Sequence, residues 1–347
     1  MSRRISFILI ASGFLFLTVN GSAFSEDIKK DFYPNGKLKS EETIENGKRN
    51  GVTRKYDSSG QLRAEIEYQQ GERSGLTKEY SGLGNLVLEA NYKFGFRDGA
   101  TKEYGEGNIL RREITYANGK PNGITKVYSE SGKLGLEQSY LAGELHGRTK
   151  EYREDGSLLS VIDYVHNQTD GVTQKFYPNG NLWVDVKLKN GKMDGLSMEY
   201  YENKQLKIVS IYKDGKLNGN SKSYYPGGAL KTEIFYQNGS QEGEAKEYFE
   251  KGQLKTIANF VNGKVEGTVK VYNEDGSIKE EVPFQNGEPI MPEGQMQGQM
   301  PNQIQIQYTF SVPNEIPIET TVHVPSEMPV ELTGNAYTTY TDEYTPS

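Results

Sequence analysis

The fold is decided by a stretch that reads YDSSGQLRAEIEYQQGERSGLT over residues 56–77. It runs from an aromatic residue through two glycine-containing turns, and its pattern returns every 24 residues without an insertion. The aromatic residue that opens each unit, called position 0 below, is Phe32, Tyr56, Tyr80, Tyr104, Tyr128, Tyr152, Phe176, Tyr200, Tyr224, Tyr248 or Tyr272. A fixed period of this kind indicates an array whose units pack on their neighbours.

Each unit contains two turn signals and two strand signals. Position +4 is glycine in most units, as in Pro34-Asn35-Gly36, where proline presets φ and glycine accepts a left-handed conformation. Position +15 is glycine as well, often after asparagine, as in Asn46-Gly47, which is a strong hairpin signal. Between the turns, Leu62 to Tyr68 alternates apolar and polar residues, as a strand with one apolar face does.

We therefore expect an all-β protein, an elongated array of about eleven 24-residue β-hairpin repeats that form a twisted antiparallel meander sheet of about twenty-two strands. If the first loop holds three residues, position 0 at the end of one strand faces position +6 on the next. Even-numbered positions of one strand then pair with even-numbered positions of its neighbour. The second loop must then also hold three residues, or the glycine at +19, such as Gly75, must form a bulge that restores this parity. We favour the bulge, because an unvarying glycine inside a strand has a backbone cause.

The composition excludes several classes of site. The chain has no cysteine, so it has no disulfide, zinc-thiolate site or lipid-attachment cysteine. Its three histidines, His146, His166 and His323, lie far apart in the sequence and form no cluster with metal-ligand spacing. The repeats are close to neutral, and residues 288–347 carry eight acidic and no basic residues, which argues against nucleic-acid binding. We expect no cofactor and no metal.

The chain divides into four parts. Residues 1–23 resemble a secretory signal peptide, with Arg3 and Arg4, an apolar run and small residues up to Ala23; the alternative is an uncleaved membrane anchor. Residues 24–287 are the array, residues 288–304 read as a flexible linker rich in Pro, Gln and Met, and residues 305–347 as an acidic, largely disordered tail. Within the tail, 305–312 and 316–324 alternate and could form short strands. We expect export to the periplasm, envelope or cell exterior, without a transmembrane segment after cleavage.

The motif Gly-x-Thr-Lys-Glu-Tyr, at residues 75–80 and 147–152, is followed by x-x-x-Gly-x-Leu and closed by Tyr-x-x-Gly. Over residues 30–287 this pattern resembles the MORN repeat variant, the unit of the bacterial YwqK antitoxin family. The resemblance implies a β-hairpin array that binds other proteins, with an immunity or antitoxin role in some members. More distant eukaryotic MORN repeats imply scaffolding or lipid association.

Two surfaces are candidates for binding, and no enzyme site is predicted, since no acid/base or nucleophilic constellation is present. The first is a groove of Lys78, Tyr80, Lys102, Tyr104, Lys126, Tyr128, Lys150 and Tyr152, with the lysines at +22 expected on the even, apolar and aromatic face. It would suit an anionic partner; alternatively, the lysine stems simply cover tyrosine rings.

The second candidate is a patch of Leu159, Val161 and Trp183. Positions +7 and +9 are basic, small or acidic in most units, so these three residues are expected to stand together on the otherwise charged face. Tryptophan is enriched in binding hot spots, although local packing would explain the same residues.

The sequence thus predicts an exported, non-enzymatic repeat protein that acts as a protein-protein interaction scaffold. Binding of glycan or anionic lipid through stacked Tyr/Lys rows, and neutralisation of a toxin, remain alternatives. The identity of the partner is not encoded in any motif.

Overall fold

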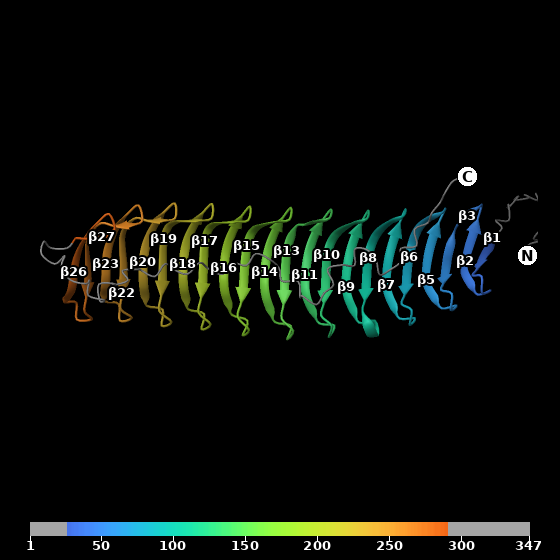
Figure 1. Cartoon of the computed structure of the whole chain (residues 1–347), viewed down its shortest axis with the longest axis horizontal. Coiled ribbons are helices and arrows are strands. Elements are labelled where there is room, and N and C mark those ends of the chain that lie inside the picture. The colour runs from blue at the N-terminus through green and yellow to red at the C-terminus, as the bar shows by residue number, and fades with distance from the viewer. Residues whose placement is uncertain (1–25, 291–347) are drawn as a thin grey trace, which may run out of the picture.

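The computed structural model describes residues 26–290 as one antiparallel sheet of 27 strands, drawn out along a single axis (Figure 1). The strands follow one another in chain order, and each pairs with its sequence neighbours, so the sheet is an open meander. The predicted all-β repeat architecture is therefore confirmed. The predicted signal peptide at 1–23 and the predicted linker and tail from Met291 onward lie outside the described residues.

Each unit contributes a first strand of eight residues and a second strand of up to nine. The first strands are β2 (Leu38–Glu45), β5 (Leu62–Gln69), β7 (Leu86–Lys93), β9 (Leu110–Ala117), β11 (Leu134–Leu141), β14 (Leu158–Val165), β16 (Leu182–Lys189), β18 (Leu206–Lys213), β20 (Leu230–Gln237), β23 (Leu254–Val261) and β26 (Ile278–Gln285). Six second strands are continuous: β6 (Glu72–Tyr80), β8 (Phe96–Tyr104), β10 (Lys120–Tyr128), β15 (Gln168–Phe176), β17 (Lys192–Tyr200) and β19 (Lys216–Tyr224).

Four second strands are interrupted at position +18, and this is the main reason why the strand count exceeds the expected number of about twenty-two. They are β3 and β4 (Lys48–Arg49, Gly51–Tyr56), β12 and β13 (Glu144–Leu145, Gly147–Tyr152), β21 and β22 (Ser240–Gln241, Gly243–Tyr248), and β24 and β25 (Lys264–Val265, Gly267–Tyr272). The described array opens with β1 (Glu26–Phe32) and closes with β27 (Glu288–Pro289). One first turn contains a short 3-10 helix, η1 (Glu106–Asn108).

The two turns of a unit differ in length. In the first turn, the Tyr33 N–H donates to the Lys37 carbonyl, which leaves the three loop residues Pro34–Gly36, and Phe32 faces Leu38 as predicted. The second turn holds only two residues, Asn46 and Gly47, both with positive φ, between the paired residues Glu45 and Lys48. Asparagine and glycine accept this left-handed conformation at little cost, which explains their recurrence.

The parity of the strands changes at a different place from the one predicted. At the start of β5, Tyr56 pairs with Leu62 but Lys55 pairs with Ala64, so Arg63 at +7 is an extra, bulged residue. The glycine at +19 also lies in a bulge, as expected. Between the pairs Tyr68–Arg73 and Ile66–Thr77, the second strand has two residues more than the first. Because two is an even number, this bulge leaves the parity of the pairing unchanged.

The bulge at +7 decides which positions share a face. Positions +8, +10 and +12 of the first strand lie with +21 and +23 of the second strand on one face, named the core face here. Positions +9 and +11 lie with +20, +22 and the aromatic at position 0 on the other, named the charged face. The prediction that the lysines at +22 share the apolar face was wrong, because the extra residue at +7 changes the parity between position 0 and the rest of the first strand.

The core face is buried along the whole described array. Every unit buries a small residue at +21, namely Thr53, Thr77, Thr101, Thr125, Thr149, Thr173, Ser197, Ser221, Ala245 and Val269. Thr101, for example, pairs with Ala90 on one side and Ile114 on the other and is 0% exposed. A single layer can bury one face only by bending around it, and the hairpins in Figure 1 are curved. We infer that the core face is the concave one.

Candidate functional site

The predicted Tyr/Lys groove forms a row on the charged face, where lysines alternate with glutamates at +9. Each of Lys78, Lys102, Lys126 and Lys150 pairs across strands with at least one of Glu65, Glu89, Glu113 and Glu137. The Nζ atom of Lys78 is 3.6 Å from Glu89, and that of Lys150 is 3.1 Å from Glu137. An anionic ligand would therefore have to compete with carboxylates that already face these ammonium groups.

The tyrosines of this row also bind the glutamates. The Tyr80 hydroxyl donates to Glu65 over 3.2 Å, and the Tyr104 hydroxyl donates to Glu89 over 2.9 Å. Partial burial, followed by the hydrogen bond to Glu89, raises the pKa of Tyr104 to about 12. The structure thus brings Lys78 to Tyr152 together as one ladder of ion pairs and hydrogen bonds, and their use as a binding groove stays a prediction.

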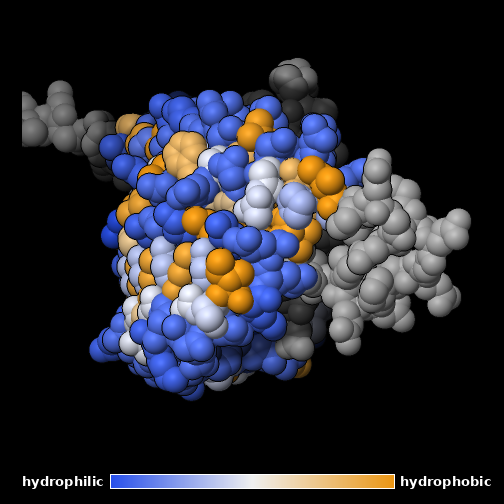
Figure 2. Space-filling view, turned by 90° about the vertical axis from the view of Figure 1, so that its left-hand side faces the viewer, coloured by the Kyte–Doolittle hydropathy of each residue, from blue (hydrophilic) through white to orange (hydrophobic). Residues whose placement is uncertain are grey.

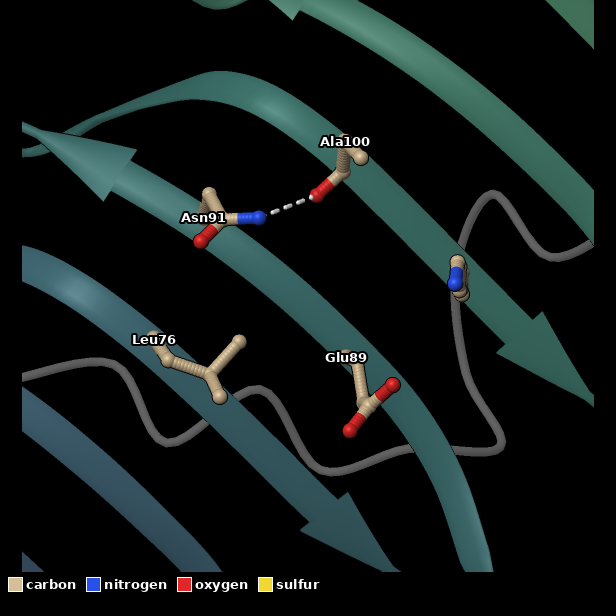
Figure 3. Close-up of a pocket in the computed structure, with 5 residues that line it drawn as sticks. Leu76, Glu89, Asn91 and Ala100 are labelled. Carbon is tan, nitrogen blue, oxygen red and sulfur yellow. Dashed lines mark hydrogen bonds between the residues drawn. The ribbon is translucent and has the colours of Figure 1, made fainter.

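A shallow depression lies within this ladder (Figure 3). It has a volume of about 170 Å³ and is lined by Leu76, Glu89, Asn91, Ala100 and Lys102. The Asn91 amide spans its floor by donating to the Ala100 carbonyl over 2.9 Å. Sites for small molecules generally occupy roughly 300 Å³ or more, so this depression is too small for an enclosed substrate.

The structure does not bring Leu159, Val161 and Trp183 together as one exposed patch. Val161 lies on the charged face opposite Lys150 and is buried. Trp183 packs against the buried cluster of the core face that includes Val184, and its indole N–H donates to Glu199 over 3.2 Å. Leu159 remains exposed. The predicted grouping was wrong, because Trp183 occupies the bulged position +7 and turns with the adjacent +8 residue toward the core face.

Trp183 instead helps to enclose a buried carboxylate. Glu199 on β17 pairs with Val184 and is almost fully buried. Its Oε1 atom accepts hydrogen bonds from the Trp183 indole and, over 2.7 Å, from Lys207 Nζ. The ring of Tyr177 lies 5.7 Å from that of Trp183. This arrangement satisfies a buried charge within the protein, which favours a structural role for Trp183.

Position +11 has a function in the fold that the sequence analysis missed. Its side chain binds the backbone at the glycine bulge: Thr43, Asn91, Thr115 and Ser139 donate to the carbonyl at +20, while Glu67 and Asp163 accept from the N–H at +20. A bulge leaves backbone groups without ladder partners, so a polar side chain at +11 is needed to bind them.

Lys187 and Asn259 at +11 make no such hydrogen bond, and in two neighbouring units the residue at +11 is apolar. Position +11 is Ile211 on β18 and Phe235 on β20, and neither side chain can make a hydrogen bond to the bulge. With Leu196 at +20 of β17, which pairs directly with Ile211, they form a row of exposed apolar residues that we name the apolar row. Leu196, Ile211 and Phe235 are 44%, 41% and 42% exposed. The sequence could have indicated these residues, because position +11 is polar in most units and apolar at Ile211 and Phe235.

The fold also joins two histidines that are distant in the sequence. The rings of His146 and His166 lie 5.2 Å apart, and His166 Nδ1 lies 2.6 Å from Glu144. Their distance in the sequence does not prevent this contact, because residues separated by almost one repeat meet on adjacent hairpins; His323 lies outside the described residues. No group of three or more His, Asp or Glu side chains within residues 26–290 is arranged to hold a metal ion.

Comparisons with solved structures give only remote likenesses. A crystal structure of a GtfA/B complex bound to UDP and GlcNAc is 20% identical, with a TM-score of 0.17, and the match covers 33% of this chain and 22% of that chain. A crystal structure of TcdB2-TccC3 is 14% identical, with a TM-score of 0.18, over 76% of this chain and 18% of that chain. The chain thus spans about a fifth of the length of each, and these likenesses carry no functional argument. No curated protein sequence matches the chain.

The family comparison is specific. The MORN repeat variant matches seven segments, at residues 28–46, 49–70, 169–190, 193–214, 217–238, 241–262 and 265–286. Each segment contains the first turn of one unit and ends at the first residue of its second turn. The units between residues 73 and 166 continue the same strand register without interruption. The array therefore consists of MORN repeat variants, and the chain belongs to this repeat family.

Proposed function

We propose that the protein is a non-enzymatic scaffold that binds another protein on the charged face of β17–β20. The observation that carries this proposal is the apolar row of Leu196, Ile211 and Phe235. Its three residues lie on β17, β18 and β20, and Asn220 on β19 pairs with Phe235 between them. The row spans roughly 14 Å at the usual strand spacing. Exposed apolar residues gathered on one surface and bordered by polar ones are typical of protein interfaces.

The apolar row reduces the stability of the array, which supports a role in binding. Where Thr115 donates to the Ile124 carbonyl at one bulge, Ile211 and Phe235 leave the equivalent backbone groups without a side-chain partner. A hydrogen bond of this kind contributes about 1 kcal/mol. We therefore expect threonine at both positions to give a more stable array, and contact with a partner would account for the apolar residues.

A protein partner suits this surface better than a glycan or an anionic lipid. The apolar row offers aliphatic and aromatic contact area, whereas lysines of the charged face such as Lys222 and Lys270 are 2.8 and 3.0 Å from glutamates. Toxin neutralisation is a narrower form of the same proposal, and the identity of the bound protein would decide it.

The test is the double variant Ile211→Thr and Phe235→Thr, in which threonine restores the hydrogen-bonding residue found at this position in other units. Proteins crosslinked to the wild-type protein in its own cells are identified and then titrated, purified, against each variant. We expect the double variant to lose affinity for its partner at least about tenfold while unfolding at equal or higher urea concentration. Asn259→Thr, at the same position outside the apolar row, is the matched control. Equal affinity of the double variant and the wild type would contradict the proposal.

We propose further that the protein acts after export. The support is the sequence of residues 1–23 alone, with two arginines, an apolar run and small residues before Phe24. Mass spectrometry of the protein isolated from its own cells tests this, since a mature chain that begins at Phe24 is expected. A chain that retains Arg3 and Arg4 in the cytoplasm would contradict it. Among residues 26–290, no helix has both the length and the hydrophobicity needed to cross a bilayer.

A further inference from the structure

The two ends of the described array differ in chemistry. At the N-terminal end, the position equivalent to the buried small residue is Lys29, which pairs with Glu42 on β2. Glu42 is buried, and Arg49 donates two hydrogen bonds to its carboxylate, over 3.1 and 3.0 Å. Charged residues inside an edge strand oppose the docking of a further strand. The N-terminal edge therefore presents an ion-paired carboxylate, in place of an apolar core, to any further strand.

The C-terminal end presents an unfinished apolar core. The buried cluster of Ile234, Tyr236, Ala245, Ala258, Phe260, Val269 and Phe284 continues to the last long strand, β26, where Val282 packs against it. β25 pairs with one edge of β26 from Ile278 to Phe284, whereas on the other edge the described residues pair only with Phe284 and Gln285, through β27. Of the three core-face residues of β26, Glu280 and Val282 are half-buried, whereas Phe284 is buried. Figure 2 looks onto this end, where hydrophobic residues lie exposed among hydrophilic ones.

The open edge of β26 has donors and acceptors for one more short strand. The Ile290 N–H donates to the Pro283 carbonyl over 2.8 Å, so Pro283 faces the open side. Residues two apart in a regular strand face the same side, and the N–H and C=O groups of Glu281 therefore face it too. Pro283 has no N–H to offer, which limits a docking strand to residues 278–282.

The residues that follow β27 by register do not suit this position. In the repeat numbering, Pro292 falls at +20 and Glu293 at +21, where the other complete units bury threonine, serine, alanine or valine. Proline cannot donate to the ladder, and a carboxylate at +21 would lie against Val282 without a partner. The repeat pattern is thus broken at the point where the last second strand would form.

We propose that residues Ile304 to Val312 of the same chain dock on this edge as its closing strand. Ile304, Ile306, Tyr308, Phe310 and Val312 alternate with four uncharged polar residues, Gln305, Gln307, Thr309 and Ser311. Strict alternation without charge is the pattern of a strand that covers an apolar face on one side. The apolar side would cover Val282 and Phe284, and the polar side would continue the charged face.

The length of the connection favours this segment over a second copy of the chain. Thirteen residues separate Ile290 from Ile304, and they can span roughly 43 Å when extended. The docking strand is only about 17 Å long, so either end of it can be reached. A short tether gives an effective concentration on the order of millimolar, which exceeds the concentration of a second copy under ordinary conditions.

The experiment compares amide hydrogen exchange of Glu281 in three full-length proteins. The first is the wild type. The second carries Ile306→Ser, Tyr308→Ser and Phe310→Ser on the apolar side, and the third carries Gln305→Ser, Gln307→Ser and Thr309→Ser on the polar side as the matched control. All substitutions lie outside the repeats, so exchange at Ile114 in the array checks that the fold is unchanged.

We expect the Glu281 amide to exchange at least about tenfold faster in the apolar-side variant than in the wild type, with the control unchanged and all three proteins monomeric by light scattering. Equal exchange in all three proteins would overturn the proposal. Protection that rises with protein concentration, together with a dimer mass, would also overturn it and would assign the edge to a second copy. The apolar row is far from this edge, so this result is independent of the proposed function.

Discussion

At the scale of single residues, most of the buried side chains at position +21 carry a hydroxyl group, although valine and alanine fill the same position in other units. The hydroxyl oxygens of Thr53, Thr77, Thr101, Thr149 and Thr173 are buried and have no hydrogen-bond partner among the described residues. In two C-terminal units, Ala245 and Val269 are buried at the same position without a polar side-chain atom. Threonine suits a strand through its branched Cβ, but its buried hydroxyl is desolvated without compensation.

Replacing Thr101 by valine is therefore expected to stabilise the array. The two side chains have nearly the same shape, Val269 is 0% exposed at the same position, and the change removes an unpartnered hydroxyl. We expect the free energy of unfolding, measured in urea, to rise by about 1 kcal/mol. The control is Thr115→Val, which removes the hydrogen bond to the Ile124 carbonyl. This change should lower the free energy of unfolding by a similar amount. Stabilisation by both changes would contradict this account.

At the scale of the element, the glycine at +19 determines how each second strand leaves its turn. Gly171 has a φ of 118°, and a Cβ placed there would lie 2.8 Å from the Cβ of Asp163. Gly267 has a φ of 84° and no atom within 4 Å of such a Cβ. Both positions need a left-handed backbone, but only the first is also crowded by the neighbouring strand.

The two glycines separate backbone strain from crowding. Gly267→Ala is expected to lower the unfolding free energy by about 1–2 kcal/mol, the cost of left-handed backbone for a residue with a Cβ. Gly171→Ala should cost about 1–3 kcal/mol more, because Asp163 must move and its hydrogen bond from the Val172 N–H is disturbed. Urea midpoints of both variants measure the difference. If Gly267→Ala lowers the unfolding free energy more than Gly171→Ala does, crowding by Asp163 does not contribute to the cost of the substitution.

At the scale of the whole molecule, each strand contacts its neighbours along the chain, and the core is divided into local clusters. One cluster contains Ala64, Ile66 and Tyr68, and another, far along the array, contains Ile234 and its neighbours. In such an array, the stability is close to a sum of unit terms and neighbour terms, so damage should stay near the place where it occurs.

Ile234→Ala is expected to destabilise only the C-terminal part of the array. The change leaves a cavity that costs roughly 2–5 kcal/mol. Hydrogen exchange followed by mass spectrometry should show lost protection in peptides from 206–290 and unchanged protection in 51–104. Ile66→Ala is the matched variant and should give the reverse pattern. Loss of protection throughout the array in either variant would mean that the array unfolds as one cooperative unit.

Much of the fold could be predicted from the sequence, because its determinants are local. The period of 24 residues, the Asn-Gly turns and the alternation from Leu62 to Tyr68 predicted hairpins, their order and the open meander. The candidate sites were harder to predict. Trp183 and the lysines at +22 were assigned to faces by counting residues, and one bulged residue per unit at +7 reversed that assignment.

The sequence alone determined the repeat, the two turns and the strand content, since these depend on which backbone conformations neighbouring residues accept. The tertiary structure alone decided which residues share a face, because a bulge shifts every position that follows it by one step. It also brought His146 to His166, exposed Leu196, Ile211 and Phe235 as a row, and left the edge of β26 open. These features arise from pairing between strands, and the pattern within one strand does not contain them.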